Sequence, residues 1–491
     1  MTLEPTVYLL RFSGTISTKS PQTRKQFQQR LERNIRDALD RREVDYDLRR
    51  EWDRLFVETD DERAGEILQT VFGLQSIRPS VTESWESIDD IVTLGHALFA
   101  EQVEGRSFGV NTRRVGQRGQ YPFDSNDVNV ALGRALDEEG GRVDLDDPEI
   151  WVRLEIHGDE VYFFVEDLAG PAGLPLGVEG RALGLISGGF DSAVAAWQML
   201  KRGVGLDFVF FNLGGPPHVR GVRRVMSEVS DRWIHGDDPT LNIVDFRPLL
   251  AELKSRVSSS YWQVVLKRLM MRSAQRIARQ EGHPALVTGE AIGQVSSQTL
   301  PNLAAIEAGV DIPILRPLVG YNKEDIIGQA REIELHRVTK GIPEFCALQG
   351  GKPVTSTTAG KLDGQEERMN LELVDVLTDD RIAESVRRLA DSTEEEPDVQ
   401  VDAIPPEATA VDLRPEVAYE RWHYPDALHV PFETALDQHA LLPPQPTYLL
   451  YCDVGLKSAL IAEKMQRAGF DAHSFRGGVP KLKKALEKSA Q

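Results

Sequence analysis

The sequence predicts a multidomain protein of α/β and α+β folds, and three observations support this expectation. The chain has 491 residues, which is too long for one hydrophobic core and predicts three or four domains. Short apolar segments typical of strands alternate with segments of helical periodicity along most of the chain. Stretches rich in glycine and proline, or in acidic residues, separate this pattern into blocks.

The composition, with 41% hydrophobic and 27% charged residues, is typical of a globular protein. Apolar runs fall short of the roughly 20 residues that span a bilayer, and the first residues lack the basic and apolar regions of a signal peptide. We therefore expect a cytoplasmic protein with no membrane partner. The two cysteines, Cys346 and Cys452, exclude an all-cysteine zinc site and a disulfide scaffold, and we assign no residue to a metal site.

Residues 1–62 have the pattern of a small ferredoxin-like domain, because strand and helix patterns alternate in two pairs. The expected elements are a strand over Val7–Phe12, a helix over Gln22–Leu39, a strand around Leu55–Thr59 and a helix over Asp61–Phe72. Residues 63–167 continue with a second block of helices and strands. Its expected elements are a helix near Ile88–Val103, a strand over Ser107–Thr112, a helix around Val128–Leu136, and strands over Ile150–Ile156 and Glu160–Val165.

The net charge of −20 argues against a nucleic-acid partner, but basic residues gather in these first two blocks. One basic stretch, between Thr6 and Arg36, includes Lys19 and Arg24, and the other includes Arg113, Arg114 and Arg118. The second stretch follows a strand, where a basic loop can meet a phosphate backbone. A charge run is usually a solvated face, so this pattern alone is weak evidence for RNA.

Residues 168–355 predict a doubly wound parallel sheet, because near-continuous apolar strands alternate with helices. The expected strands are Leu183–Ile186, Leu206–Phe211, Asn242–Phe246 and Ala285–Thr288. Ligands of such sheets bind beyond the carboxyl ends of the strands. Residues 356–404 are helical and then acidic, as expected of a tether. Residues 405–491 return to an α/β pattern.

The most informative motif is the run Ser-Gly-Gly-Phe-Asp-Ser over Ser187–Ser192, between an apolar strand and a helix. Free N–H groups at the start of the helix form an anion site, and the glycines let a phosphate approach the backbone. The run lacks the Gly-Lys-Ser/Thr of a Walker loop and resembles the PP-loop of ATP pyrophosphatases, which activate a carbonyl oxygen by adenylation. An ordinary strand-to-helix turn is the alternative for a bare Ser-Gly-Gly.

The two cysteines lie in contexts that favour working thiols. Cys452 ends an apolar strand and precedes a helix, so that N–H donors point at its sulfur. Together with Val411–Pro415, Tyr424–Pro431 and Phe475–Pro480, this segment resembles a rhodanese domain. The common rhodanese loop has arginine directly after the cysteine, whereas this chain has Asp453, with Lys457 as a substitute positive charge. Cys346 lies in a loop-like segment between Pro343 and Gly350, which predicts an exposed thiol.

The order of these blocks resembles the long form of tRNA 4-thiouridine synthetase, in which a THUMP domain is the second block. The matching stretches are Ile16–Arg24, Ser187–Ser192, Phe211–Gly215, Val265–Met271, Gly289–Thr299 and Tyr321–Ile326. The resemblance implies that the first two domains hold tRNA by its shape and backbone. The RNA-binding residues would be Lys19, Arg24, Arg113, Arg114 and Arg118.

The resemblance further implies ATP and Mg²⁺ as cofactors and a uridine of tRNA as substrate, with position 8 known only from the family. Attack by uracil O4 on the α-phosphate would form an adenylate and release pyrophosphate. Asp191 would orient the nucleotide or hold a magnesium ion, unless it only caps the helix. The remaining ATP-binding residues would be Leu185, Ile186, Ser187, Gly188, Gly189, Ser192, Phe211, Lys267, Gly289, Gln298 and Lys323.

By the same resemblance, a cysteine desulfurase loads Cys452 with a persulfide sulfur that displaces AMP from the adenylate. Cys346 then forms a disulfide with Cys452, which a reductant such as thioredoxin reopens. Three alternatives stay open. The chain could be a sulfur carrier for the thiazole of thiamine, a non-catalytic RNA-binding protein with a relic nucleotide site, or a PP-loop enzyme for another base. The oligomeric state also stays open, with a homodimer among the alternatives.

Overall fold

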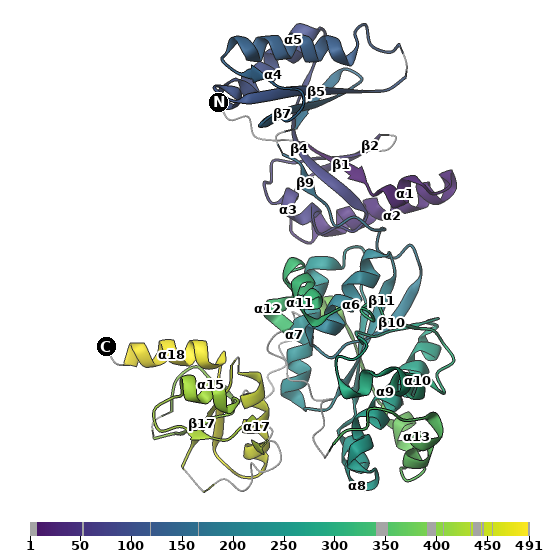
Figure 1. The fold of residues 1–491 in the computed structure, drawn as a ribbon, viewed down its shortest axis with the longest axis vertical. Coiled ribbons are helices and arrows are strands. Elements are labelled where there is room, and N and C mark those ends of the chain that lie inside the picture. The colour runs from purple at the N-terminus through teal and green to yellow at the C-terminus, as the bar shows by residue number, and fades with distance from the viewer. Residues whose placement is uncertain are drawn as a thin grey trace. The chain divides into compact units, whose positions relative to one another are not determined.

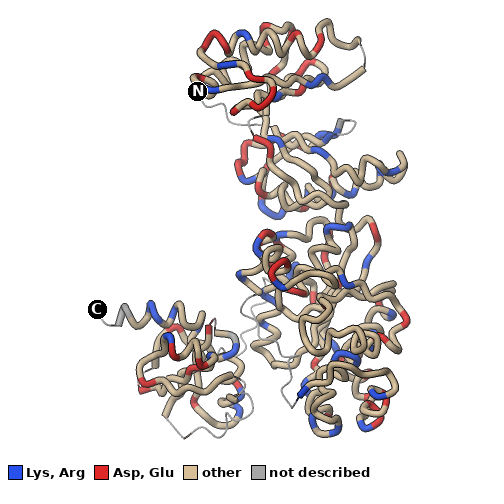
Figure 2. Tube along the Cα trace, viewed as in Figure 1, with Lys and Arg blue, Asp and Glu red and all other residues tan. Residues whose placement is uncertain are grey.

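The computed structural model describes residues 7–51, 54–117, 119–164, 166–339, 352–389, 399–405, 407–432, 434–435, 443, 446–453 and 455–489. The chain forms two compact units, one of Met1–Val178 with Lys201–Gly203 and the other of Glu179–Leu200 with Val204–Gln491 (Figure 1). Within the described residues, each helix is too short or too polar to cross a membrane. Acidic and basic residues are interspersed along both units (Figure 2).

The first unit is built on one sheet of nine strands. The strand order is β2-β3-β1-β4-β8-β7-β5-β6, and β9 pairs with β4. The strands are β1 (Val7–Phe12), β2 (Asp47–Glu51), β3 (Arg54–Glu58), β4 (Leu74–Ser84), β5 (Ser107–Val115), β6 (Arg142–Val143), β7 (Ile150–His157), β8 (Glu160–Phe164) and β9 (Leu168–Ala169). The helices are α1 (Gly14–Ser17), α2 (Pro21–Asp40), α3 (Ala64–Leu68), α4 (Ile88–Val103) and α5 (Ser125–Glu138).

Two hydrophobic cores lie in this unit, and β4 connects the parts that form them. Leu31 of α2 and Leu10 of β1 belong to the first core, while Leu132 of α5 and Leu154 of β7 belong to the second. The expected strands and helices of the two blocks are present, but β2 and β4 were not expected. The helix expected over Asp61–Phe72 is shorter in the structure: α3 ends at Leu68, and the chain turns through Gly73, with φ of 105°, into β4.

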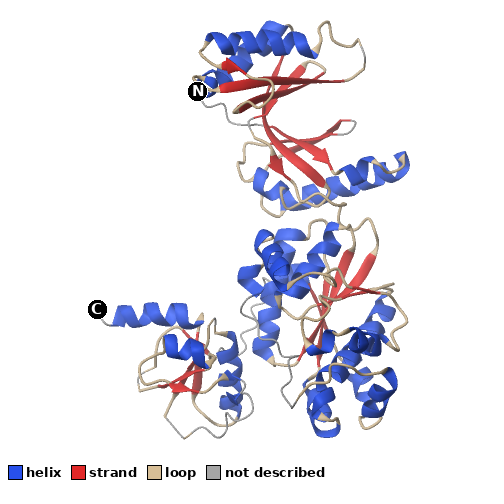
Figure 3. Ribbon diagram, in the orientation of Figure 1, coloured by secondary structure: helices blue, strands red, loops and turns tan. Residues whose placement is uncertain are grey.

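The second unit contains the expected parallel sheet, whose strands are red in Figure 3. Its strand order is β14-β13-β10-β11-β12-β15. The parallel strands are β10 (Arg181–Leu185), β11 (Gly205–Asn212), β12 (Thr240–Asp245), β13 (Leu286–Val287) and β14 (Ile314–Leu315). Its helices are α6 (Phe190–Lys201), α7 (Pro216–Trp233), α8 (Arg247–Arg256), α9 (Trp262–Glu281), α10 (Leu300–Glu307), α11 (Lys323–Glu332) and α12 (His336–Thr339). Apolar faces of α8 and α9 pack on β11 and β12 in its largest core.

The segment expected to be a tether is part of this domain as far as residue 389. It forms α13 (Ala359–Glu366), α14 (Glu372–Asp379) and β15 (Ile382–Ser385), which pairs antiparallel with β12. Leu362 and Val374 are fully buried in the same core as α9, and Ser273 of α9 lies 2.6 Å from Thr378, hydroxyl to hydroxyl. Amphipathic helices, rather than a solvated linker, explain the expected helical pattern.

The C-terminal part of the second unit is a parallel sheet of five strands in the order β16-β20-β19-β17-β18. The strands are β16 (Gln400–Val401), β17 (Thr409–Asp412), β18 (Leu428–His429), β19 (Tyr448–Tyr451) and β20 (Ala472–Phe475). The helices are α15 (Glu416–Arg421), α17 (Leu456–Arg467) and α18 (Gly478–Ser489). Separate apolar cores line the two faces of this sheet, as expected for a rhodanese-like α/β fold.

Candidate active site

The glycine-rich loop Ser187–Ser192 connects β10 to α6 and is closed by its own serines. The Ser192 hydroxyl donates to the Gly189 carbonyl at 2.9 Å and accepts from the Ser187 N–H at 3.2 Å. Gly188 has φ of 83°, which a residue with a side chain rarely adopts. The loop therefore presents backbone N–H groups at the start of α6, which is the geometry of an anion site.

A cavity of about 440 Å³ opens beside this loop, at the carboxyl ends of β10, β11 and β13. The sequence-predicted residues that line it are Leu185, Ile186, Ser187, Gly189, Asp191, Ser192, Phe211, Lys267, Gly289 and Gln298. Gly188 lies in the same loop but does not line the cavity. Lys323 does not line it either, but it forms an ion pair with Asp191, which does. The parallel sheet thus brings together residues separated by more than 100 positions along the chain.

Gly289 allows two segments of the cavity wall to touch. A Cβ atom added to Gly289 would lie 2.7 Å from the carbonyl carbon of Asp191 and 2.8 Å from the Ser192 nitrogen. Because these neighbours are backbone atoms, any side chain at position 289 would displace the glycine-rich loop. Glycine at this position is thus a packing requirement of the site.

Asp191 and Lys323 form an ion pair at the edge of the cavity. Lys323, the first residue of α11, places its Nζ 2.9 and 3.1 Å from the two carboxylate oxygens of Asp191. The Gln294 amide donates to the same carboxylate at 2.9 Å. The Lys323 ammonium also lies 4.3 Å from the centre of the Phe190 ring, a cation–π distance. This pairing holds the Lys323 ammonium group against Asp191, which lines the cavity.

Glu290 is a buried carboxylate that the sequence did not single out. It accepts from Lys267 Nζ at 3.1 Å, from Arg316 Nε at 3.0 Å and from the Thr288 hydroxyl at 3.2 Å. Burial opposes ionisation of Glu290, but the charges of Lys267 and Arg316 outweigh it and lower the pKa of this carboxyl. The position of Glu290 directly after Gly289 and close to a strand end was the feature of the sequence that could have identified it as a site residue.

His218 is a second residue that the sequence did not indicate. It lies in the first turn of α7 and lines the cavity, with its ring 4.6 Å from that of Phe210, centre to centre. Burial lowers the pKa of His218 to about 3, against a smaller opposing hydrogen bond to the Ser187 backbone. The imidazole is therefore neutral, and one histidine in a glycine- and proline-rich segment gives no pattern that would identify it.

Cys452 lies between β19 and α17, and its side chain is 3% exposed. Its Sγ accepts from the Gly455 N–H at 3.2 Å and from the Ser458 hydroxyl at 3.5 Å. Asp453 is exposed, and Lys457 lies with its Nζ 4.9 Å from the centre of the Phe432 ring. Backbone and hydroxyl donors, rather than an arginine, surround the sulfur in the described part of this loop. Cys346 lies outside the described residues.

The predicted RNA-binding residues lie at separate places in the first unit. Lys19 and Arg24 flank the start of α2, where Arg24 donates to the Ser17 carbonyl at 2.7 Å. Arg113 and Arg114 are neighbours on β5, so their side chains point to opposite faces of the sheet. Arg114 donates to the Phe123 carbonyl. Arg118 lies outside the described residues.

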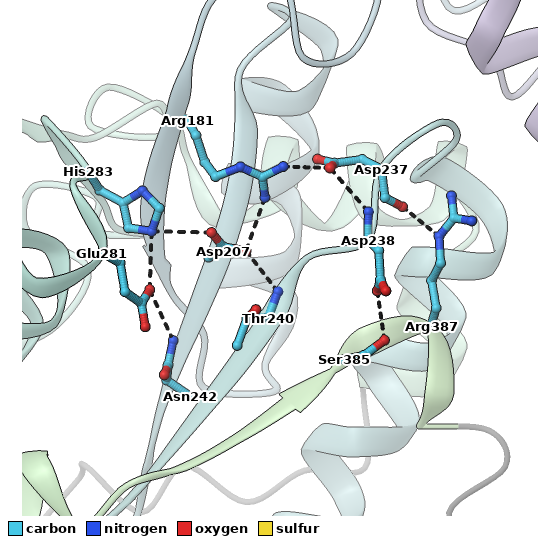
Figure 4. A network of polar contacts seen from close by, with 10 residues as sticks. All are labelled: Arg181, Asp207, Asp237, Asp238, Thr240, Asn242, Glu281, His283, Ser385 and Arg387. Carbon is cyan, nitrogen blue, oxygen red and sulfur yellow. Dashed lines mark hydrogen bonds and ion pairs between the residues drawn. The ribbon is translucent and has the colours of Figure 1, made fainter.

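A second polar cluster lies toward the amino ends of the same parallel strands (Figure 4). His283 Nε2 lies 3.2 Å from both Asp207 Oδ2 and Glu281 Oε2. Arg181 pairs with Asp207 at 3.0 Å, and Arg381 pairs with Glu281 at 3.3 Å. Burial lowers the pKa of His283, but Asp207 and Glu281 outweigh it and raise the pKa. The charges compensate one another, so this is a structural ionic network that joins α9 to the sheet.

The parallel sheet with its glycine-rich anion loop and the rhodanese-like domain with its buried cysteine define a class, the PP-loop enzymes with an attached sulfur-handling module. Sequence models of known families match in the same order. They are the ferredoxin-like domain of ThiI (residues 7–77), the THUMP domain (86–166), the thiamine biosynthesis protein ThiI (177–371) and the rhodanese-like domain (396–485).

Curated relatives extend this similarity over nearly the whole chain. A tRNA sulfurtransferase of Desulfurococcus amylolyticus is 36% identical over 98% of this chain and 99% of its own length. Another, from Pyrobaculum aerophilum, is 34% identical over 94% of this chain and 95% of its own length. The chain belongs to the tRNA sulfurtransferase family and is an enzyme of that family, which confirms the resemblance predicted from the sequence.

A solved structure supports the same assignment. A crystal structure described as a 4-thiouridine synthetase–RNA complex with bound ATP matches with a TM-score of 0.69 and 28% identity. The match covers 78% of this chain and 100% of that one.

Proposed function

We propose that this chain converts a uridine of tRNA, position 8 by family resemblance, to 4-thiouridine, with ATP as the activating cofactor. The observation that carries the proposal is the cavity beside Ser187–Ser192, with the Asp191–Lys323 ion pair at its edge. The names of the relatives support the reaction. The solved relative described with RNA and ATP supports both ligands.

ATP would bind with its phosphates on the glycine-rich loop. The Ser187 and Ser192 hydroxyls and the N–H groups at the start of α6 would hold the pyrophosphate part, and Lys267 would add positive charge. Leu185, Ile186 and Phe211 would line the base side of the cavity, while Gly289 and Gln298 would border the nucleotide. These groups stabilise the charge that develops as pyrophosphate leaves.

Uracil O4 would attack the α-phosphorus of ATP, forming an O–P bond and breaking the bond to the pyrophosphate oxygen. The oxygen at C4, a poor leaving group, thereby becomes part of AMP and can depart. Asp191 would orient Lys323 toward the reacting phosphate, since both of its oxygens contact that ammonium group.

Magnesium would accompany ATP, because Mg²⁺ prefers phosphate oxygens and water with one or two carboxylates. Asp191 is the loop carboxylate available to it, but its oxygens already contact Lys323 and Gln294. Asp191 would therefore neutralise Lys323 rather than supply the main ligand for the ion.

The sulfur would come from a persulfide on Cys452, loaded by a cysteine desulfurase. The N–H of Gly455 and the hydroxyl of Ser458 lie where they stabilise negative charge on sulfur. The terminal sulfur would attack C4 and expel AMP. The Cys346 thiolate would then attack the Cys452 sulfur, which leaves the sulfur and its electron pair on C4 and forms a Cys346–Cys452 disulfide. Thioredoxin, or a similar dithiol, would reduce that disulfide.

The test is transfer of ³⁵S from cysteine to tRNA that lacks 4-thiouridine, with a desulfurase, a dithiol reductant and ATP. We expect ATP-dependent label in tRNA with the wild type and none with Cys452→Ala or Asp191→Asn. The Asp191→Asn enzyme should still carry label on Cys452. Label that reaches the protein but never tRNA would contradict the proposal and leave a sulfur carrier.

We also propose that the chain passes sulfur to thiamine synthesis, because the matching family model carries the description of a thiamine biosynthesis protein. This second role needs the persulfide but not the adenylation site. In a thiamine-requiring strain, Asp191→Asn should restore growth and Cys452→Ala should not. If the wild type restores growth and neither variant does, the role in thiamine synthesis would depend on adenylation, which would contradict this second proposal.

A further inference from the structure

The helices of the first unit pack on one face of its nine-stranded sheet, and the opposite face is partly charged. Side chains alternate between faces along a strand. On β1, Leu10 belongs to the core under α2, whereas Leu9 belongs to a small apolar cluster on the opposite face. Phe56 of β3 and Tyr162 of β8 join that cluster. We call this side the second face.

Four arginines from four strands converge on the second face around one glutamate of β7. Glu155, whose side chain is 2% exposed, has its carboxylate oxygens 3.7 Å from the nearest guanidinium nitrogen of each of three arginines. These arginines are Arg54 of β3, Arg78 of β4 and Arg113 of β5. The fourth, Arg11 of β1, is the register partner of Arg54.

Within the described residues, carboxylates lie beside three of the four arginines. Among the described residues, the carboxylates that pair with these arginines are Glu155 and Asp167, which lies 2.9 Å from Arg78. Arg11 takes part in neither of these sets of ion pairs, and it lies directly opposite Arg54. Like charges on directly opposed strand residues, as at Arg11 and Arg54, are destabilising.

Arg11 is the arginine of this cluster whose positive charge is opposed by its neighbours. Within the described part of the chain, no carboxylate lies within ion-pair distance of its guanidinium group. Burial lowers the pKa of Arg11, and the charges of Arg54 and Arg78 lower it further, against a smaller effect of Glu155. A bound anion beside Arg11 would offset this repulsion.

We propose that Arg11, Arg54, Arg78 and Arg113 form a binding site for a backbone phosphate of tRNA on the second face. Arg113, whose side chain is 52% exposed, and the partly exposed Arg11 would contact the phosphate. The side chains of Arg54 and Arg78 are 5% and 14% exposed, so they would attract the phosphate by their positive charge without contacting it directly. The inference rests on the proposed function, because it assumes that tRNA is the partner.

Glu155 has a defined part in this site. It holds three arginines together, and it receives a hydrogen bond across 3.1 Å from His157. At 3.7 Å, the nearest arginine nitrogens are beyond normal hydrogen-bond distance from its oxygens. The carboxylate therefore attracts the guanidinium groups by charge without accepting hydrogen bonds from them. The guanidinium group of Arg113 thus keeps its N–H donors for a phosphate.

The test is binding of tRNA that lacks 4-thiouridine to the full chain, measured by fluorescence anisotropy over a range of salt concentrations. Arg11→Gln and Arg113→Gln should each lower affinity about five- to tenfold at 0.1 M salt. Each should also reduce the slope of log K against log salt by about 0.7 to 0.9, the value for one phosphate contact. Arg63→Gln is the matched control, because Arg63 pairs with Asp61 and is 62% exposed in the same unit; it should change affinity less than twofold.

Thermal stability separates this site from a structural role. Arg11→Gln should melt at or above the wild-type temperature, because repulsion is relieved, whereas a structural arginine would lower it. Glu155→Gln should melt lower without tRNA and gain more than the wild type from saturating tRNA. Arg11 and Arg113 variants that bind like Arg63→Gln would overturn the site while leaving the proposed function intact. A wild type that does not bind tRNA would overturn both.

Discussion

At the scale of single residues, the shape of the site depends on close contacts between segments that are distant in the sequence. Gly289 is the sharpest case, because its missing Cβ leaves room for the backbone of Asp191 and Ser192. Glu290, one residue later, orients Lys267 and Arg316. Neither contact can be derived from a motif, because each depends on which segments the sheet brings side by side.

Gly289→Ala should lower kcat/KM for tRNA-dependent pyrophosphate release about 100-fold, since a displacement of about 1 Å in a catalytic loop has effects of that size. Gly320→Ala is the matched control, because a Cβ there would meet no atom within 4 Å. Equal activity of the two variants would show that the loop tolerates displacement.

Ser458→Ala should slow alkylation of Cys452 by iodoacetamide about fivefold at pH 7.5, because the sulfur loses a hydroxyl donor worth about 1 kcal/mol. The rate is read by mass spectrometry of the Cys452 peptide. Thr447→Ala, which removes a hydroxyl bonded to Asp471 in the same domain, should leave the rate unchanged.

At the scale of secondary-structure elements, the sequence identified the parallel strands well and the edges of the sheets poorly. Strands such as β11 are buried along most of their length, so their sequences are nearly continuous apolar runs. β15 lies at an edge, and Ile382 at its start is 57% exposed, so its pattern resembles a linker. β4 was missed because its apolar residues Leu74, Ile77 and Val81 are three or four positions apart, which does not match the strand period of two, and because it contains Pro79.

Substitutions on α14 test whether this segment belongs to the catalytic domain. Val374→Ala should destabilise the domain by about 2 kcal/mol, because Val374 is fully buried in the core. Val376→Ala on the same helix should cost less than about 0.5 kcal/mol, because Val376 is 60% exposed. Urea unfolding followed by tryptophan fluorescence measures both, and a free tether would make the two variants equal.

At the scale of the whole molecule, stability should depend on pH through the network of Asp207, Glu281 and His283. The folded-state pKa of His283 is raised, so its stabilisation is complete below the unfolded value near 6.5 and is lost as pH rises through the folded value. The pKa of Asp207 is lowered against the effect of burial, so its contribution exists above about pH 4 and is lost in acid.

His283→Gln should therefore melt at a lower temperature than the wild type at pH 6 and approach it at pH 9. Differential scanning calorimetry over this range measures the difference, with His336→Gln as a control histidine in the same domain. A difference that grows as pH rises would contradict the assigned ion pairs.

The sequence predicted the domain types and about half of the residues that line the cavity. The strand end and the glycine-rich turn left a local signal, and the family resemblance indicated the others. Glu290 and His218 were missed, because burial and pairing arise only when distant segments meet. The arginine cluster was missed for the same reason. Arg11, Arg54 and Arg78 are scattered along the sequence, and only the sheet register places them together.

The pairing of β15 with the sheet limits the distance over which the proposed sulfur delivery could act. With the chain fixed through residue 389 and the rhodanese-like domain described from residue 399, ten peptide links separate the two. Such a span reaches at most about 35 Å, whatever its conformation. Under the proposed function, transfer of sulfur from Cys452 would be an encounter within one chain, whose frequency does not depend on how dilute the enzyme is.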